Sequence, residues 1–318
     1  MASPKNEPGQ PRRRRIRRTV HFGEPLPPGA HTFRASWLCG PSVLWMTLLL
    51  VLPLAFVIAM SFAQRGDAGE VEWRFTWDNY ARLGGRGELG FDPVQPLIFA
   101  RSLAVGLATA VLCLLAGLPV AFFIAGLPRR WKSLALTLVV IPFWTNLLIR
   151  TYGWQLLLAP EGWLTKALTA TGFLSAGTSL YPGWPAVMLA VVCDYLPFMV
   201  LPLYASVEKL DWSLSEAAAD LGAGPVRNFW HAVLPQIRPG MMAGGILVFL
   251  PATGQFVIPD LLGGAKVALL GNAIQQQFGP SRDWPFGSAI AVAALAVMFL
   301  GLWLHTRVTR GHKEVGLP

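Results

Sequence analysis

One carboxylate lies deep within an apolar stretch and is the first candidate for chemistry. Asp194 is about eight residues into the stretch 186–205, or roughly 12 Å along a helix that rises about 1.5 Å per residue. A charge at membrane depth costs about 2.5–3.5 kcal/mol on insertion scales, so such a group is a functional candidate by default. Asp194 could bind a cation, with cation–π contacts from Tyr195 and Trp144. Equally, it could form a structural ion pair with Arg150 or face a water-filled seam.

Further polar residues lie in or close to the apolar stretches. Gln255 offers both a donor and an acceptor, either to a solute or to a neighbouring helix. Asp260 and Asp283 fall near the outer mouth of the predicted helices, where carboxylates attract cations and where ordinary loop solvation also accounts for them. Arg150 is near the outer end of its stretch, where a long side chain can extend to the headgroups, so we expect a structural role first. Asp194, Gln255 and Asp260 are thus candidates for the lining of a polar pathway.

The reactive side chains do not form an enzymatic site. The five histidines lie in the tails, in one loop or at the end of an apolar stretch, without the H-E-x-x-H spacing of a zinc site. The sequence has no G-x-x-x-x-G-K-[ST] phosphate loop, since 263–267 contains a lysine but lacks the spacing and the hydroxyl residue. Cys39, Cys113 and Cys193 are widely spaced in apolar stretches and are interpreted as small core residues. We therefore expect no catalysis and no bound metal or nucleotide on this chain.

The composition is that of a membrane protein. Of the 318 residues, 53% are hydrophobic and only 14% are charged, against about 25% charged residues in ordinary soluble domains. A bilayer core about 30 Å thick requires about 20 apolar residues in a helix, because backbone groups in lipid must be satisfied within the segment. We expect six transmembrane helices at roughly 41–62, 97–125, 134–158, 186–205, 241–262 and 286–306.

The basic residues predict how these helices are oriented. Most of the 26 Lys and Arg residues lie in the N-terminal tail, the turn between spans two and three, the loop between spans four and five, and the C-terminal end. Basic loops stay on the cytoplasmic side during insertion, so both termini are expected there. The run Arg12–Arg18 is interpreted as a topology signal rather than as a site for nucleic acid or anionic lipid. The stretch 41–62 is too long, and follows too long a tail, for a cleaved secretory signal.

The loop between the fourth and fifth spans carries the signals of two short helices. Ser213 and Glu216 have the S-x-x-E spacing of a capping box, which predicts that a helix begins there. Its apolar face has residues at i, i+3, i+4 and i+7, namely Leu214, Ala217, Ala218 and Leu221. Gly222 is expected to end this helix in a left-handed conformation, and Pro225 to begin a second helix that Pro235 stops. Two turns are marginal alone, so this face requires lipid or a partner protein, and its small alanines favour a partner.

This loop resembles a motif of the permease subunits of ABC importers. Glu216-Ala217-Ala218, Gly222 and Leu234-Pro235 match the E-A-A…G…L-P pattern of that family, with Ala232 where a bulkier aliphatic is usual. In that family the loop is a coupling helix that sits on the ATPase subunit. Other strings, spread over roughly 41–306, are similar to the permeases of spermidine/putrescine-type importers: Pro142-Phe143-Trp144, Ile149–Trp154, Tyr195–Tyr204, Phe256–Lys266 and Arg282–Gly287.

The resemblance implies an all-α integral membrane protein with six transmembrane helices and the ABC importer type I permease fold, in a bacterial inner membrane. It implies import of polyamines, together with a second homologous permease, a dimer of ATPase subunits and an extracytoplasmic solute-binding protein. ATP would act on the partner subunit, and this chain would bind no cofactor and no nucleic acid. The coupling residues would be Ser213, Glu216, Ala217, Ala218, Gly222, Leu234 and Pro235, and the substrate-pathway candidates Asp194, Tyr195, Trp144, Gln255 and Asp260.

Two alternatives stay open. The chain could be the same type of permease for another small solute, since the polyamine branch also holds permeases for other solutes. It could also be an autonomous ion-coupled carrier with Asp194 as its proton or cation site, although that class does not explain the loop and often shows inverted repeats. The expected organisation is a basic tail at 1–36, a first span with an outer loop at 37–96, a core at 97–306 with its coupling loop at 208–238, and a cytoplasmic tail at 307–318. The outer loop mixes glycines with aromatic residues and predicts an amphipathic segment or a docking surface.

Overall fold

The computed structural model describes residues 32–66, 69–87, 90–175 and 177–310. Most of the basic tail, including Arg12–Arg18, and the last eight residues therefore lie outside the described residues. The chain divides into two units, Met1–Pro53 and Leu54–Pro318. Helix α1 (Thr32–Ser61) contains Pro53, the last residue of the first unit, and its segment Gly40–Ser61 is long and apolar enough to cross a membrane.

Within the described residues, four more helices are long and apolar enough to cross a membrane. Three of them are α3 (Val94–Gly126), α7 (Trp184–Val207) and α13 (Trp284–Arg310), as the sequence predicts. The fourth is the continuous run Pro225–Thr253. The expected number of six spans is reached when one bent pair of helices, Arg129–Trp144 with Leu147–Ala170, counts as a single span.

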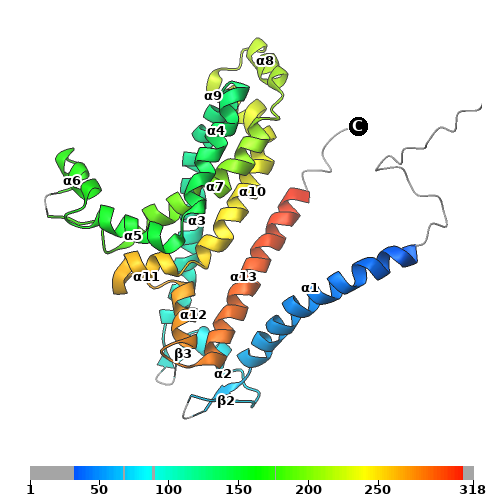
Figure 1. Cartoon of the computed structure of the whole chain (residues 1–318), viewed down its shortest axis with the longest axis vertical. Helices are drawn as coiled ribbons and strands as arrows, with labels where there is room; N and C mark the ends of the chain where they lie inside the picture. The colour runs from blue at the N-terminus through cyan, green and yellow to red at the C-terminus, as the bar shows by residue number, and fades with distance from the viewer. Residues whose placement is uncertain (1–31, 67–68, 88–89, 176, 311–318) are drawn as a thin grey trace, which may run out of the picture. The chain divides into compact units, whose positions relative to one another are not determined.

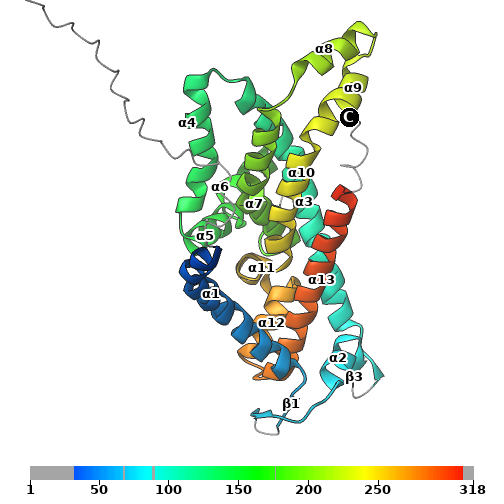
Figure 2. The ribbon, with the colours of Figure 1, turned by 90° about the vertical axis from the view of Figure 1, so that its right-hand side faces the viewer.

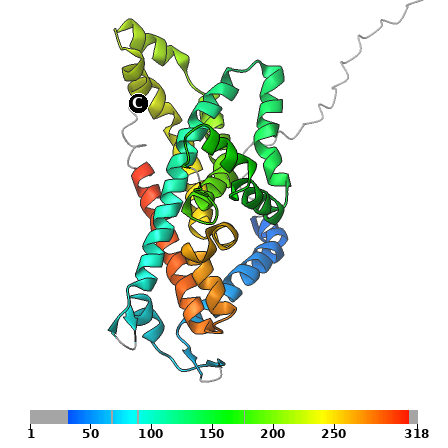
Figure 3. The same ribbon diagram turned by 90° about the vertical axis from the view of Figure 1, so that its left-hand side faces the viewer.

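The bent pair corresponds to the stretch 134–158, which we expected to be one transmembrane helix. Helix α4 (Arg129–Val140) leads into the 3₁₀ turn η1 (Ile141–Trp144), and α5 (Leu147–Leu158) and α6 (Trp163–Ala170) leave it at 92°. Pro142 in η1 cannot donate a backbone hydrogen bond. The side chain of Asn146 then caps α5 by accepting from Leu148 N at 2.8 Å. The break, visible in Figures 2 and 3, therefore follows from a proline and a cap that hydropathy does not register.

The fifth span also differs from the expected 241–262. It begins earlier, with α9 (Pro225–Asn228), a π-helical turn η2 (Phe229–Val233) and α10 (Leu234–Thr253) in one run. Pro235 was expected to stop the second short helix, and this is wrong. The proline falls in the first turn of α10, directly after the π turn, where its missing N–H interrupts no regular α-helical ladder. The span ends at Thr253, and residues 257–263 form the separate helix α11 (Val257–Gly263).

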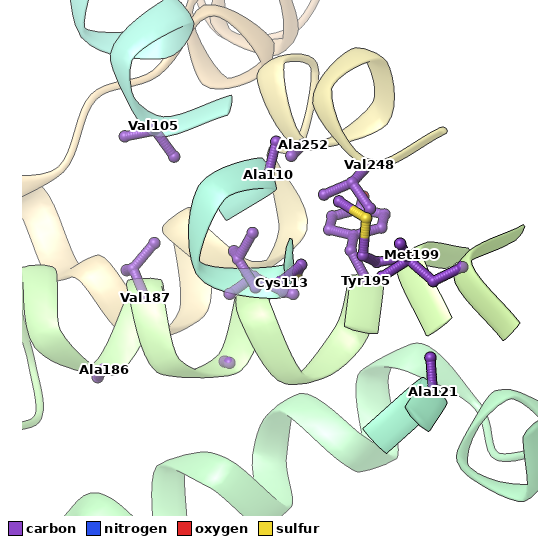
Figure 4. Close-up of a cluster of buried hydrophobic side chains, with 14 of the residues drawn as sticks. Val105, Ala110, Cys113, Ala121, Ala186, Val187, Tyr195, Met199, Val248 and Ala252 are labelled. Atoms are coloured by element: carbon purple, nitrogen blue, oxygen red, sulfur yellow. The ribbon is translucent and has the colours of Figure 1, made fainter. Parts of the chain in front are cut away.

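The core of the second unit lies where α3, α7 and α10 pack against one another. Figure 4 shows Met199 and Tyr195 of α7 beside Val248 of α10, with Cys113 of α3 in the same cluster. Glycine permits this close approach, since a Cβ at Gly244 of α10 would lie 2.7 Å from Met199 Sδ. Cys113 is buried as expected, whereas Cys193 is exposed, because apolar residues on a membrane helix also face lipid.

The loops lie at two opposite ends of the second unit. At one end are two short hairpins with α2 (Asp78–Leu83) between them, formed by β1 (Gln64–Arg65), β2 (Val71–Glu72), β3 (Arg86–Gly87) and β4 (Gly90–Phe91). Near them α12 (Leu270–Phe278), which follows the turn η3 (Gly264–Lys266), packs against the start of α13. At the other end are α8 (Trp212–Asp220) and α9, as Figures 1 and 2 show. The predicted coupling loop and the predicted outer loop are thus separated by the length of the bundle.

Candidate functional site

Helix α8 of the predicted coupling loop has a different cap from the expected one. It begins at Trp212, and its cap is Asp211, whose side chain accepts from Ser213 N at 3.0 Å and from Ser213 Oγ at 2.7 Å. Ser213 therefore lies in the first turn and supports the cap, so the predicted capping box with Glu216 is wrong in detail. An aspartate in a β conformation directly before a helix is an equally good cap. The hydrogen bonds from Ser213 hold the pKa of Asp211 below its usual value.

The end of α8 follows the prediction. Gly222 has φ +81°, in the left-handed region. Gly222 N bonds to Ala219 O at 2.9 Å and Ala223 N to Ala218 O at 3.0 Å, so two of the last carbonyls are satisfied. Pro225 begins α9 two residues after Ala223, as expected. The turn therefore requires a left-handed conformation at position 222, which glycine adopts without the steric strain that other residues have there.

The apolar face of α8 is not covered within the described chain. Helix α8 has no buried residue, and Leu214 and Leu221 are 53% and 89% exposed. Ala217 is exposed and Ala218 is half-buried. Two large apolar side chains of the adjoining α9 and η2, Val226 and Trp230, are also exposed. We name these six residues the α8 surface.

Side-chain hydrogen bonds hold α8 firmly while its apolar face stays open. Asn228 Nδ2 donates to Ser215 O at 3.0 Å and to Ser215 Oγ at 2.9 Å, which joins α9 to α8. Asp211 N donates to Gln236 Oε1 at 3.0 Å, which joins the start of α8 to α10. Leu234 is half-buried against the core, Pro235 is exposed, and Glu216 is exposed on α8. These hydrogen bonds therefore join α8 both to α9 and to α10.

A second connection joins this end of α7 to the bent pair. Lys132 Nζ of α4 lies 2.9 Å from Glu208 Oε1, directly after α7. The Tyr204 hydroxyl and Lys132 both bond to Glu208 and hold its pKa below the usual value. A pocket of about 240 Å³ adjoins the pair and is also lined by Trp212 of α8. The start of α8 thus adjoins the contact between α4 and α7.

Among the pathway candidates, Asp194 is buried and forms an ion pair with Arg150. Asp194 is 8% exposed on α7, and its Oδ1 contacts Nη2 of Arg150 on α5. Arg150 Nη1 also donates to Pro142 O in η1, and its Cζ lies 5.7 Å from the centre of the Phe143 ring. The structural ion pair that the sequence left open is therefore formed, and it joins the bent pair to α7.

Tyr195 and Gln255 are brought together, whereas Trp144 and Asp260 are not part of this group. The Tyr195 hydroxyl donates to Pro251 O and accepts from Gln255 Nε2, both at 3.3 Å. Gln255 Oε1 accepts from Phe256 N and Val257 N, so it links α10, α11 and α7 just beyond the end of the span. Trp144 is 79% exposed, and its neighbour Phe143 makes a cation–π contact with Arg150. Asp260 is exposed on α11.

Asp283, for which the sequence left attraction of cations and ordinary loop solvation open, is 1% exposed. Arg82 of α2 donates to it at 3.0 Å, Arg65 lies 4.0 Å away, and its Oδ1 accepts from Phe286 N. The Arg82 guanidinium also stacks on the Phe286 ring at 4.1 Å. Solvation as a loop residue is therefore wrong, and Asp283 joins the outer loop to the start of α13. Its arginine partners are far away in sequence, so no local signal marks those ion pairs.

Comparison with known proteins connects this architecture to one family. Residues 117–313 match the family model described as binding-protein-dependent transport system inner membrane component. The chain is 42% identical to the spermidine/putrescine transport system permease protein PotB of Escherichia coli K12, over 84% of this chain and 94% of PotB. PotB of Salmonella typhimurium LT2 has the same identity, with 84% and 90% covered.

Solved structures show the same fold at lower identity. The crystal structure of a bacterial ABC transporter involved in the import of the acidic polysaccharide alginate matches with a TM-score of 0.62 and 19% identity, over 87% of this chain and 98% of that chain. This chain therefore combines a helical bundle and the short helix α8 with a sequence that matches inner-membrane transport components. The chain belongs to the family of inner-membrane components of binding-protein-dependent transport systems.

Proposed function

We propose that this chain is one of two homologous permeases that form the translocation pore of an ATP-driven polyamine importer. The observation that carries this proposal is the 42% identity to the spermidine/putrescine permease PotB over 84% of the chain. A buried carboxylate, Asp194, beside aromatic residues supports a cationic solute. The family relationship favours this function over an autonomous ion-coupled carrier.

Energy is supplied by a partner in this proposal, because no phosphate-binding loop occurs in the sequence. The α8 surface is the docking site for one subunit of an ATPase dimer, with its small alanines allowing close contact and its leucines filling a groove. The end with α8 and both termini then face the cytoplasm, and the end with α2 faces the extracytoplasmic binding protein. The distance between these two loop regions along the bundle supports this orientation (Figure 1).

In this proposal the hydrogen-bonded connection between α8 and the core transmits the movement that drives transport. Closure of the ATPase dimer moves α8, and the hydrogen bonds from Asn228 and Gln236 carry the motion into α9 and α10. Because α7 and α10 pack closely against each other, they tilt together and switch access to the pathway from one side to the other. The pathway candidates Asp194, Tyr195 and Gln255 lie on or next to these two helices, with Trp144 and Asp260 further along the route.

The proposal is tested by uptake in a bacterial strain that lacks its own polyamine importers. The chain is expressed with the second permease, the ATPase and the binding protein from its own system, and uptake of labelled spermidine and putrescine is measured. We expect uptake that stops when ATP is depleted. Uptake of a different solute with none of either polyamine would overturn the substrate assignment.

A pair of variants on α8 tests the coupling role. Glu216 and Asp220 are both exposed carboxylates on this helix, one turn apart. We expect Glu216→Ala to abolish polyamine-stimulated ATP hydrolysis, because Glu216 belongs to the motif. Asp220→Ala should leave it intact, since a negative charge at a helix C-terminus contributes no favourable dipole interaction. Equal activity of both variants would contradict the proposed docking of α8.

A further inference from the structure

The guanidinium of Arg150 contacts both the carboxylate of Asp194 and the aromatic ring of Phe143. Its Nη2 contacts Asp194 Oδ1, and its Cζ is 5.7 Å from the Phe143 ring centre, within the range of a cation–π contact. Phe143 is in edge-to-face contact with Phe198 at 4.8 Å, and Phe198 adjoins Tyr195 at 6.2 Å. One carboxylate and three aromatic rings are therefore grouped around this position.

This group has the chemistry of a binding site for organic cations. A carboxylate balances the positive charge, while aromatic rings attract it through their negative faces and replace water without competing for hydrogen bonds. Asp194 Oδ1 is in direct contact with Arg150 Nη2, which balances the charge of the carboxylate. The group would need a replacement cation if Arg150 moved away.

Arg150 and Asp194 belong to different helices on the two sides of the contact. Asp194 and Tyr195 belong to α7, which is packed into the core and joined to α10 through Pro251 and Gln255. Arg150 belongs to α5, which follows the 92° break, and its side chain is 19% exposed. The ion pair is therefore a contact between a core helix and the outer part of a broken span.

We propose that a primary ammonium group of a polyamine binds between Asp194, Phe143 and Phe198 in place of the Arg150 guanidinium. Arg150 is then the chain's own competitor for the site: it balances Asp194 in the empty permease and withdraws with α5 when the substrate enters. The inference rests on the proposed polyamine function and identifies the site that this function uses. A polyamine carries compact ammonium groups, each smaller than the planar guanidinium of Arg150.

Binding of labelled spermidine to the purified importer without its binding protein tests this site. In the wild type the site is available only in the fraction of molecules in which the ion pair is open. Arg150→Gln removes the competitor and leaves a shorter, neutral amide. With about 10% of molecules open in the wild type, the dissociation constant for spermidine should fall roughly tenfold. Lys166→Gln is the matched control, because it removes a cation from another ion pair of the bent pair, with Glu161, and should leave spermidine binding unchanged.

A second variant covers the case in which Arg150→Gln fails to fold with an unpaired carboxylate. Asp194→Asn combined with Arg150→Gln replaces the ion pair by two amides and leaves no buried charge. This double variant should assemble and bind spermidine at least tenfold more weakly than the wild type. Spermidine affinity equal to that of the wild type in the double variant would overturn the site, as would an unchanged dissociation constant in well-assembled Arg150→Gln. If the complete wild-type importer takes up no polyamine, the proposed function fails instead, whatever these variants do.

Discussion

Gly222 is the residue at which a single methyl group should have the clearest effect on coupling. Its φ is +81°, whereas Gly224, two residues later, has φ −66°. Both glycines are in the α8–α9 turn, and a Cβ at either position would meet no atom of this chain within 4 Å. Alanine at the two positions therefore differs in backbone strain and not in steric contacts within the chain.

The magnitude follows from this difference in φ. An L residue in the left-handed conformation costs about 1–2 kcal/mol, which changes a local equilibrium by a factor of roughly 5–30. Gly222→Ala should therefore shift the end of α8 away from its present conformation by about that factor. Gly224→Ala carries no such strain, so it should leave the conformation of the turn unchanged.

The assay is ATP hydrolysis and spermidine uptake by the complete importer in lipid, with the binding protein present. Gly222→Ala should reduce stimulated hydrolysis and uptake together, while Gly224→Ala retains both. Gly222→Asn separates strain from a clash with the docked subunit, because asparagine is larger than alanine but tolerates the left-handed region. We expect Asn to recover part of the activity lost with Ala. An Asn variant worse than the Ala variant, or equal activity of the two alanine variants, would refute the argument from strain.

Three further predictions concern the parts that support the two sites. Gly240→Ala places its Cβ 2.5 Å from Pro202 O, where overpacking costs about 1–3 kcal/mol, whereas Gly245→Ala meets nothing within 4 Å; only the former should lower the thermal denaturation temperature of the complex, by several degrees. Asp211→Ala removes the cap of α8 and should lower stimulated ATP hydrolysis, whereas Asp211→Asn retains a capping oxygen. Because the pKa of Asp211 is below its usual value, its carboxylate stays ionised between pH 5 and 8, and the rate of ATP hydrolysis should not fall in this range through loss of the cap. Asp283→Ala breaks charged hydrogen bonds worth about 1.5–3 kcal/mol and should increase proteolysis of the outer loop in spheroplasts, without change in an Arg74→Ala control whose partner is Glu72.

Local signals in the sequence predict the coupling loop well and the broken helices poorly. Gly222 and Pro225 each act within one turn of their own position, so the end of α8 and the start of α9 can be read directly. Hydropathy averages over about 19 residues, and in that average Pro142 is a small interruption. In the structure it contributes to a 92° break, because Asn146 begins a new helix before the old one can resume.

Contacts between distant segments explain the remaining differences. Asp283 could not be placed from the sequence, since its partner Arg82 is 201 residues away and both occur in loop-like surroundings. Asp194 and Arg150 were recognised as a candidate pair because two opposite charges in apolar stretches must find partners. Which aromatic residue faces them could not be predicted, because a 3₁₀ turn at Ile141–Trp144 determines whether Phe143 or Trp144 points inward, and the proline there does not specify that turn.

Asp194 lies on α7 and Glu208 directly after it, so a movement of this helix affects the ion pairs of both residues. Asp194 and Glu208 are 14 residues apart along one helix, or about 21 Å at about 1.5 Å per residue. A tilt of about 10° about one end of such a segment moves the other end by roughly 3.6 Å, which exceeds the length of a hydrogen bond. If α7 pivots at a point outside this segment, a tilt that strains the contact between Lys132 and Glu208 would also displace Asp194 from Arg150. Since coupling between two sites is reciprocal, an ammonium group bound at Asp194 should in turn favour the conformation that engages the ATPase.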